Sequence, residues 1–365
     1  MTVPRFPPGQ TGTPRPVRAS VQGRAANGGA RPRSPADETV DRWYQPDRSG
    51  GPARVTTRSA LRSALLAAVC AGLATPALAD DVPGWLAPHV GLGDGQIAAP
   101  VLQRARSLYL RKSAEGRVSN PCWFAMDATR PNDPDGGRFY VVCEAEQSFS
   151  AIPAGHGSGL DLPGAADFRN GRRCAKNFGN AADSNLTTGG SYVTGEARTT
   201  FKGFFRDAGG GTSPFLRTFV PFEGEGETAN ARSREIGGHA AVTMKGVCLR
   251  RDPGNPYADP QGFVRFGHLV DYAGGRSNGC TSWSAADAAK IGAMVEGRPT
   301  TLYIYPEAAD VREAARGAGY WDATCRAEIG APKFWPRAVL EPIIARYKAA
   351  HPPPPPRPTP LCTGE

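Results

Sequence analysis

A short run near residue 280 combines the residue types that cysteine-based acyl transfer uses. Cys280 follows Gly279 directly, and Ser277 stands three positions before the sulfur. A glycine here lets the backbone turn tightly, so that a carbonyl group can approach the sulfur closely. The amide N–H groups of Gly279 and Cys280 could then stabilise the oxyanion that forms when a thiolate attacks an acyl carbon. The alternative interpretation is a structural or disulfide-bonded cysteine in a turn.

The residues that follow Cys280 predict a helix at 285–296, with Ser284 as its N-cap and Asp287 three positions later. A thiolate just ahead of a helix N-terminus has its pKa lowered from about 8.5 into a range of roughly 3.5–7.5. We therefore expect Cys280 to be an acidic thiol.

A cysteine nucleophile needs a base that accepts its proton and a group that orients the base. The chain has five histidines. His89 and His351 lie toward the two ends of the exported segment and are expected to be solvated. Glycines flank the other three, His156, His239 and His268. The sequence by itself leaves all three open as the base.

The first 79 residues predict an exported protein. Residues 1–50 are rich in Pro, Gly, Arg and Ala and cannot build a core, so we expect them to be disordered. A segment with three arginines (residues 54–62) precedes the apolar run 64–74, and Ala77-Leu78-Ala79 resembles a signal-peptidase site. The apolar run is too short to span a bilayer. We predict a secretory signal cleaved after Ala79, a periplasmic or secreted product, and no membrane anchor.

The leader also accounts for most of the positive charge. The chain has 43 Lys+Arg and 34 Asp+Glu, a net charge of +9. Residues 1–79 hold 11 Arg and 4 acidic residues, which is +7, so residues 80–365 keep 32 against 30, or +2. Because no basic stripe interleaves with aromatic residues, the composition argues against a nucleic-acid partner. No zinc-type pair of cysteines is present, and we expect no metal site.

The cysteine count agrees with export. Outside the leader there are seven: Cys122, Cys143, Cys174, Cys248, Cys280, Cys325 and Cys362. Six of them can form three disulfides in an oxidising compartment, which leaves one free thiol. Their connectivity is one of fifteen and stays open, although Cys325 is the nearest partner in sequence for Cys362. A catalytic Cys280 would explain the odd number.

The elements that must position these residues are mostly short strands. A helix is predicted at 96–115 from apolar residues at helical spacing. Short strands between Gly, Pro, Asn and Asp are predicted at 123–126, 139–142, 191–193, 215–219, 240–243 and 300–305. Weaker helical stretches follow at 310–316 and 337–350, and Pro352–Pro356 enforce an extended tail. The pattern indicates a β-dominated fold, all-β or α+β.

Several short motifs in a fixed order resemble one known family, the murein L,D-transpeptidase catalytic domain, in the YkuD-like branch with HG-x-GS and R-S-x-G-C elements. The matching segments are 126–127, 139–142, 156–159, 177–180, 184–185, 189–194, 234–240 and 276–280. The resemblance covers roughly residues 120–306. It implies a YkuD-like β-sandwich or barrel, flanked by the leader (1–79), an N-terminal helical segment (80–119) and a partly helical C-terminal extension (307–365).

The resemblance also implies an activity. Enzymes of this family transfer acyl groups of peptidoglycan stem peptides through a cysteine thioester and use no metal or organic cofactor. By the match of motifs, Cys280 is the nucleophile and His239 the base, while Gly279 and Ser277 belong to the catalytic motif. A second set, Arg276, His156 and Asn278, is expected to shape the site or bind substrate.

Three points stay open at this stage. The stretch between His239 and Cys280 is long for the family and contains Cys248 and a Pro/Gly-rich loop at 252–261, which leaves His268 as the alternative base. Water could replace the amine acceptor, which would make the protein an L,D-carboxypeptidase. A non-catalytic, disulfide-rich wall-binding module is the alternative of another class, and it predicts that Cys280 is bonded.

Overall fold

The structure is a computed structural model of the chain in which residues 82–363 are described. The predicted leader and its cleavage after Ala79 lie outside these residues. Between residues 82 and 363 the chain forms five α-helices and seventeen strands, which makes the fold α+β with a large mixed sheet. The β-dominated α+β expectation is therefore confirmed at the level of fold class. Among the helices of this part of the chain, none combines the length and apolar character needed to cross a membrane.

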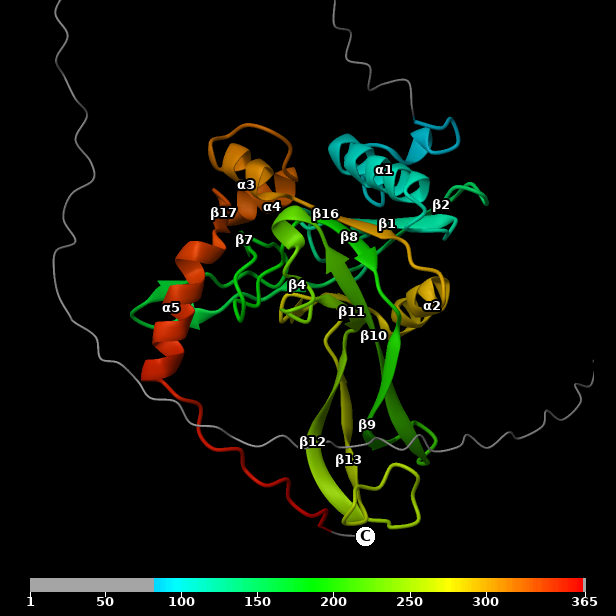
Figure 1. The fold of residues 1–365 in the computed structure, drawn as a ribbon, viewed down its shortest axis with the longest axis vertical. Helices are drawn as coiled ribbons and strands as arrows, with labels where there is room; N and C mark the ends of the chain where they lie inside the picture. Colours follow the sequence, from blue (N-terminus) through cyan, green and yellow to red (C-terminus); the bar gives the residue numbers. More distant parts are fainter. Residues whose placement is uncertain (1–81, 364–365) are drawn as a thin grey trace, which may run out of the picture. The chain divides into compact units, whose positions relative to one another are not determined.

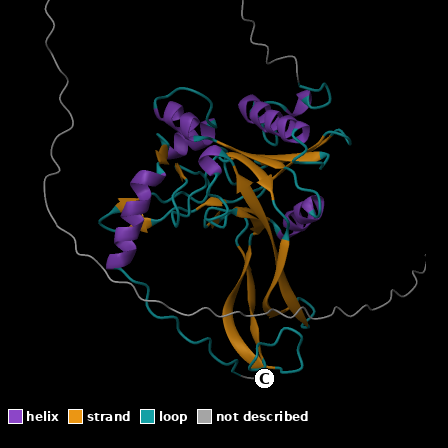
Figure 2. Ribbon diagram, in the orientation of Figure 1, coloured by secondary structure: helices purple, strands orange, loops and turns teal. Residues whose placement is uncertain are grey.

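The main sheet has eleven strands (Figures 1 and 2). Its path runs β12-β13-β9-β10-β8-β16-β1-β2-β3, and β11 pairs with both β10 and β15. Three pairs are parallel, β1 with β16, β9 with β13, and β11 with β15, and the others are antiparallel. The strands are β1 (Cys122–Asp127), β2 (Phe139–Cys143), β3 (Ser148–Ile152), β8 (Gly190–Thr194), β9 (Arg198–Arg206), β10 (Thr212–Gly224), β11 (Gly237–Ala240), β12 (Val242–Arg251), β13 (Phe263–Asp271), β15 (Thr281–Trp283) and β16 (Thr301–Tyr305).

The centre of the sheet is buried on both faces. Helix α1 (Ala99–Ala114) packs on β1 and β16 through the apolar residues that predicted it, and Trp123 points into the same cluster. Phe124 and Met126, which alternate with Trp123 along β1, enter the main core on the other face. The helix begins three residues later than predicted because Pro100 occupies its first turn, where a proline needs no N–H partner.

The other helices follow the predictions closely with one exception. Helices α2 (Ala285–Val295), α3 (Ala308–Ala315) and α5 (Arg337–Ala350) lie where the sequence placed them. The seven-residue helix α4 (Ala323–Ile329) was not predicted. It is too short to show an apolar period, and only Cys325 in it is buried.

Three two-stranded sheets hold the loops around the main sheet. Strand β4 (His156–Gly157) pairs with β14 (Arg276–Ser277), and β5 (Asp161–Leu162) pairs with β6 (Ala166–Asp167). Strand β7 (Asn177–Gly179) pairs with β17 (Lys333–Trp335), so the segment after residue 307 returns to the middle of the chain.

Two long hairpins, β9–β10 and β12–β13, form an element that we call the arm (residues 198–224 and 242–271). The predicted loop at 252–261 belongs to it and joins β12 to β13. At the loop end of the arm, Phe201 and Phe204 of β9 pack with Phe266 of β13 and with Tyr257, with ring centroids 4.1–6.1 Å apart. Strands β9 and β13 were not predicted, and the strand predicted at 240–243 covers only the end of β11 and the first two residues of β12. Most residues of β9, β12 and β13 are exposed or half-buried, and their apolar residues do not alternate regularly.

Three disulfides are present, as the cysteine count predicted, and Cys280 is the free cysteine of the described residues. Such a set indicates an extracellular protein. The suggested pairing of Cys362 with Cys325 is wrong. Cys325 is buried against Cys174, whereas the proline-rich tail runs to the arm, where Cys362 bonds Cys248 and Leu361 bridges to Leu249.

The two long-range disulfides should differ in their effect on stability. They close segments of 151 and 114 residues, so unfolded-state entropy alone predicts nearly equal losses of about 5 kcal/mol. Cys174 and Cys325 are fully buried, whereas the tail held by Cys362 is exposed and gains freedom in the native state once released. We expect Cys174→Ala/Cys325→Ala to lose about 3–5 kcal/mol of unfolding free energy and Cys248→Ala/Cys362→Ala much less. Denaturant unfolding of both double variants tests this, and equal losses would contradict it.

Candidate active site

The loop from Arg276 to Cys280 is held in one conformation by its own residues. Gly279 has φ +102°, a conformation that side chains rarely adopt, and a Cβ there would meet the Leu186 carbonyl oxygen at 3.0 Å. The Ser277 hydroxyl hydrogen-bonds the carbonyl oxygen of Cys280 and lies 3.3 Å from that of His156. Glycine is thus required at 279 for two independent reasons, and Ser277 is a clamp within the loop.

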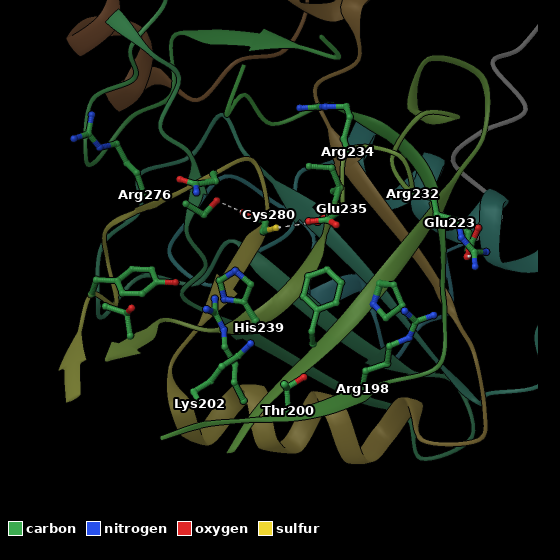
Figure 3. A pocket seen from close by; sticks show the side chains of 18 of the residues that line it. Arg198, Thr200, Lys202, Glu223, Arg232, Arg234, Glu235, His239, Arg276 and Cys280 are labelled. Carbon is green, nitrogen blue, oxygen red and sulfur yellow. Dashed lines mark hydrogen bonds and ion pairs between the residues drawn. The ribbon is translucent and has the colours of Figure 1, made fainter. Parts of the chain in front are cut away.

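The Cys280 sulfur is half-buried at the wall of a pocket (Figure 3). Its S–H group points to the carbonyl oxygen of Glu235 at 3.6 Å, and the N–H of Gly237 donates toward the sulfur. Glu235 itself has φ +55°, a strained conformation for a residue other than glycine. The segment before His239 therefore wraps around the sulfur.

The expectation of an acidic thiol is wrong. Burial raises the pKa of Cys280 above its ordinary value, and the lowering effects of the Gly237 N–H, Arg217 and Arg234 do not offset it. Cys280 does not stand at the N-terminus of helix α2, because strand β15 separates the two, and the Ser284 side chain caps the N–H of Asp287 in the first turn of the helix. At neutral pH the sulfur is a thiol, so attack on a carbonyl requires a base.

His239 lies on the strand next to Cys280. Strand β11 pairs in parallel with β15, which places His239 opposite Ser282, and the ring borders the same pocket as the sulfur (Figure 3). Its Nδ1 lies 2.9 Å from the carbonyl oxygen of Ala240. Because a carbonyl only accepts, Nδ1 carries the proton and Nε2 keeps its lone pair. Burial first, and then the charge of Arg217, lower the pKa of His239 to about 4, so the imidazole is a neutral base at physiological pH.

The other two candidate histidines do not border the pocket. His268 lies exposed on β13, opposite Lys245. His156 is fully buried: its Nδ1 accepts from Arg138 at 2.8 Å, and its Nε2 donates to the Gly171 carbonyl oxygen at 3.0 Å. Burial lowers the pKa of His156 well below its ordinary value, and both ring nitrogens are occupied. Through the β4–β14 pairing, His156 supports the backbone of Arg276 and Ser277 and does not contact substrate space.

The loop also leaves two amides available for an oxyanion. No hydrogen bond within residues 82–363 engages the N–H groups of Gly279 and Cys280. Backbone N–H groups next to a nucleophile are the usual donors to a developing negative oxygen. The two amides are therefore free to donate to a ligand, and the oxyanion site stays a prediction.

The pocket has a volume of about 900 Å³ and a strongly cationic lining. Seven lining residues are cationic and two are acidic: Arg198, Lys202, Arg217, Arg232, Arg234, Lys245 and Arg276 against Glu223 and Glu235. Arg276 and Asn278, both predicted as substrate-binding residues, line it and are exposed. Arg276 also donates to the Asn170 carbonyl oxygen at 2.5 Å, which fixes part of its guanidinium.

Two arginines of the site had no predicted role. Arg234 donates to the Thr188 hydroxyl at 2.5 Å and to the Leu186 carbonyl oxygen at 2.8 Å, and burial lowers its pKa. No carboxylate pairs with it in the part of the chain that is described, so its charge acts on the pocket and on Cys280. Arg217 comes from β10, where every second residue, Arg217, Phe219 and Pro221, lines the pocket. An i, i+2 pattern at 217–221 is the signal that could have identified it.

The described residues suggest no metal centre at this site. Away from the pocket, the described residues bring one set of possible metal ligands together: Cys122, Cys143 and Glu146. The two cysteines of this set are bonded to each other in a disulfide. Comparisons with known proteins add no assignment: no family model, no curated protein and no solved structure matches this chain.

The protonation states can be tested by alkylation. Because burial raises the pKa of Cys280, the rate of reaction with iodoacetamide should rise with pH up to an inflection above about 8.5, the value of an unperturbed thiol. Arg217→Gln should move the inflection further up, since it removes a charge that lowers this pKa. Lys176→Gln, on the exposed surface away from the pocket, is the matched control. An inflection below pH 7.5 would show that the thiolate is stabilised and that the assignment of a neutral pair is wrong.

Proposed function

We propose that the chain is an exported L,D-transpeptidase that acts on peptidoglycan stem peptides through a thioester on Cys280. The observation that carries the proposal is the free Cys280 thiol in one pocket with His239, whose Nε2 keeps its lone pair. The order of motifs that resembles the murein L,D-transpeptidase family adds to it. In this proposal the mixed sheet is a YkuD-like catalytic domain extended by the arm.

The proposed acylation starts from the neutral pair. His239 Nε2 takes the proton of the thiol while the sulfur attacks the carbonyl carbon of the third stem residue. The amides of Gly279 and Cys280 receive the negative oxygen. As the tetrahedral intermediate collapses, the bond to the terminal D-alanine breaks, and the leaving amine takes the proton from His239. The products are the thioester and free D-alanine.

The second half reverses these roles. An amine of a neighbouring stem attacks the thioester carbonyl, and His239 passes the amine's proton to the departing sulfur. One amide replaces another, and the Cys280 thiol is regenerated without any redox change. With water as the acceptor the same steps give an L,D-carboxypeptidase, which is the second candidate within this chemistry. The wall-binding alternative predicts a bonded Cys280, and the free thiol disfavours it.

The proposal is tested by intact mass after incubation with a tetrapeptide stem. The wild-type protein should gain the mass of a tripeptide acyl group, and Cys280→Ala should gain none while it remains folded, since it removes one reactive atom from a half-buried position. His239→Gln should slow acylation about 10²–10⁴-fold. His268→Gln, which alters an exposed residue outside the pocket, is the control and should acylate normally. A wild-type protein that forms no adduct, or a Cys280→Ala protein that still cross-links stems, would sink the proposal.

The pH dependence of acylation should reflect the pKa of His239. Protonation of the imidazole removes the base, so kcat/KM should fall as pH drops through about 4 and should already be on its plateau at pH 6. A histidine with an ordinary pKa would instead place this limb near pH 6.5. Stopped-flow acylation between pH 3.5 and 8 distinguishes the two cases, and a limb near 6.5 would contradict the buried, neutral His239.

A further inference from the structure

The arm carries a row of cations that the proposed catalytic steps do not use. Along β9, Arg198, Thr200 and Lys202 border the pocket. Side chains two apart on a strand share a face, so one face of this strand is turned to the ligand space. On β10 the same holds for Arg217 and Phe219, while the alternating Val220 on the other face is buried in the core.

The second hairpin also contributes to the lining of this pocket. Thr243 and Lys245 of β12 border it, also two positions apart. Lys245 of β12 and Lys202 of β9 thus border the same pocket from different hairpins. A ligand that extends from Cys280 along the arm would meet cations from both hairpins.

These cations have no acidic partners. In the described part of the chain no ion pair involves Arg198, Lys202, Arg217 or Lys245. Of the two acidic residues on the lining, Glu223 already pairs with Arg232 at 2.9 Å. Seven cations against two acids leave an excess of five positive charges here, whereas residues 80–365 carry only +2 in total. Like charges held together cost free energy, and a bound polyanion removes that cost.

We propose that Lys202, Arg217 and Lys245 form a carboxylate-binding subsite on the arm, separate from the Cys280 loop, which selects peptides with several free carboxylates. This inference rests on the proposed function: the carboxylates would be those of the acyl donor beyond the scissile bond. Stems whose carboxylates are amidated would therefore be poor donors. The arm would act as the specificity element of the site.

Two features favour a peptide carboxylate over a nucleic acid as the ligand. The pocket lining offers Phe219 and Tyr272 as its aromatic side chains, and they do not alternate with the lysines as a base-stacking platform would. The pocket also converges on Cys280, whose chemistry addresses acyl groups. The two lysines are exposed, so their contribution should weaken as salt is raised.

The test measures binding by calorimetry to full-length Cys280→Ala protein, which cannot turn a ligand over. The probes are tetraglutamate and tetraglutamine, which differ in charge and hardly in shape. We expect tetraglutamate to bind and tetraglutamine to bind far more weakly. Adding Lys202→Gln or Lys245→Gln should each weaken the binding of tetraglutamate about fivefold at low salt, and the two changes together about 20-fold.

The matched control is Lys176→Gln/Lys290→Gln, which removes the same charge from two exposed positions outside the pocket. It should bind tetraglutamate like the parent protein. The subsite would be overturned if both double variants lost the same affinity for tetraglutamate, or if both probes bound equally well. Tighter binding of a thymidine octanucleotide than of tetraglutamate would also overturn it. A separate assay compares kcat/KM of the wild-type protein for free and amidated stems. If no stem acylates Cys280, the proposed function fails while the tetraglutamate result still decides the subsite.

Discussion

The parallel pairing of β11 with β15 is the contact on which the candidate site depends. These strands lie 41 or more residues apart in the chain, yet the register sets His239 opposite Ser282, two residues beyond Cys280. The antiparallel pairing of β11 with β10 holds the same strand from its other side and brings Phe219 next to His239, with ring centroids 6.4 Å apart. Because a slip of one residue would turn His239 to the other face, the register fixes the chemistry as well as the fold.

Burial and the charge of the pocket both shift the pKa values of Cys280 and His239. Burial disfavours charge, so it raises the pKa of Cys280 and lowers that of His239 to about 4. The cations around the pocket act on both groups in the same sense, since Arg217 lowers both pKa values. For the sulfur, burial is the larger effect. The resting state is thus a thiol and a neutral imidazole that line one pocket. In the proposed reaction, the positive field of this pocket would stabilise the negative charge that develops on attack.

The sequence predicted the parts of the fold that have a periodic signal. Helices α1, α2 and α5 and strand β1 show regular apolar spacing, and each lies within a few residues of its predicted bounds. In the arm only part of β10, at 215–219, had such a signal, because the outer strands β9, β12 and β13 are mostly exposed or half-buried and pack partly on aromatic residues of other segments. The contact that joins the two hairpins, β9 with β13, pairs residues about sixty positions apart, which no local pattern reports.

The residues of the candidate site also fall into those with a local sequence signal and those without one. Cys280, Gly279 and Ser277 are neighbours in sequence, so their joint role could be recognised from one short run. The raised pKa of the thiol could not be recognised in this way, since it depends on burial and on the strand that separates the loop from helix α2. Arg217 and Arg234 were missed for a related reason: they reach the pocket from β10 and from the segment before β11. Charge that comes from several elements becomes visible only after folding.

The arm must resist the repulsion of its own charges. Lys245 on one hairpin and the cations on the other face the same space, so their mutual repulsion favours separation of the two hairpins. The pairing between β9 and β13, which joins the two hairpins, is confined to residues 204–205 against 266–267. The aromatic cluster lies at that point, and the disulfide between Cys248 and Cys362 ties β12 to the exposed proline tail after α5. The two hairpins are therefore joined by residues that are not part of the pocket lining.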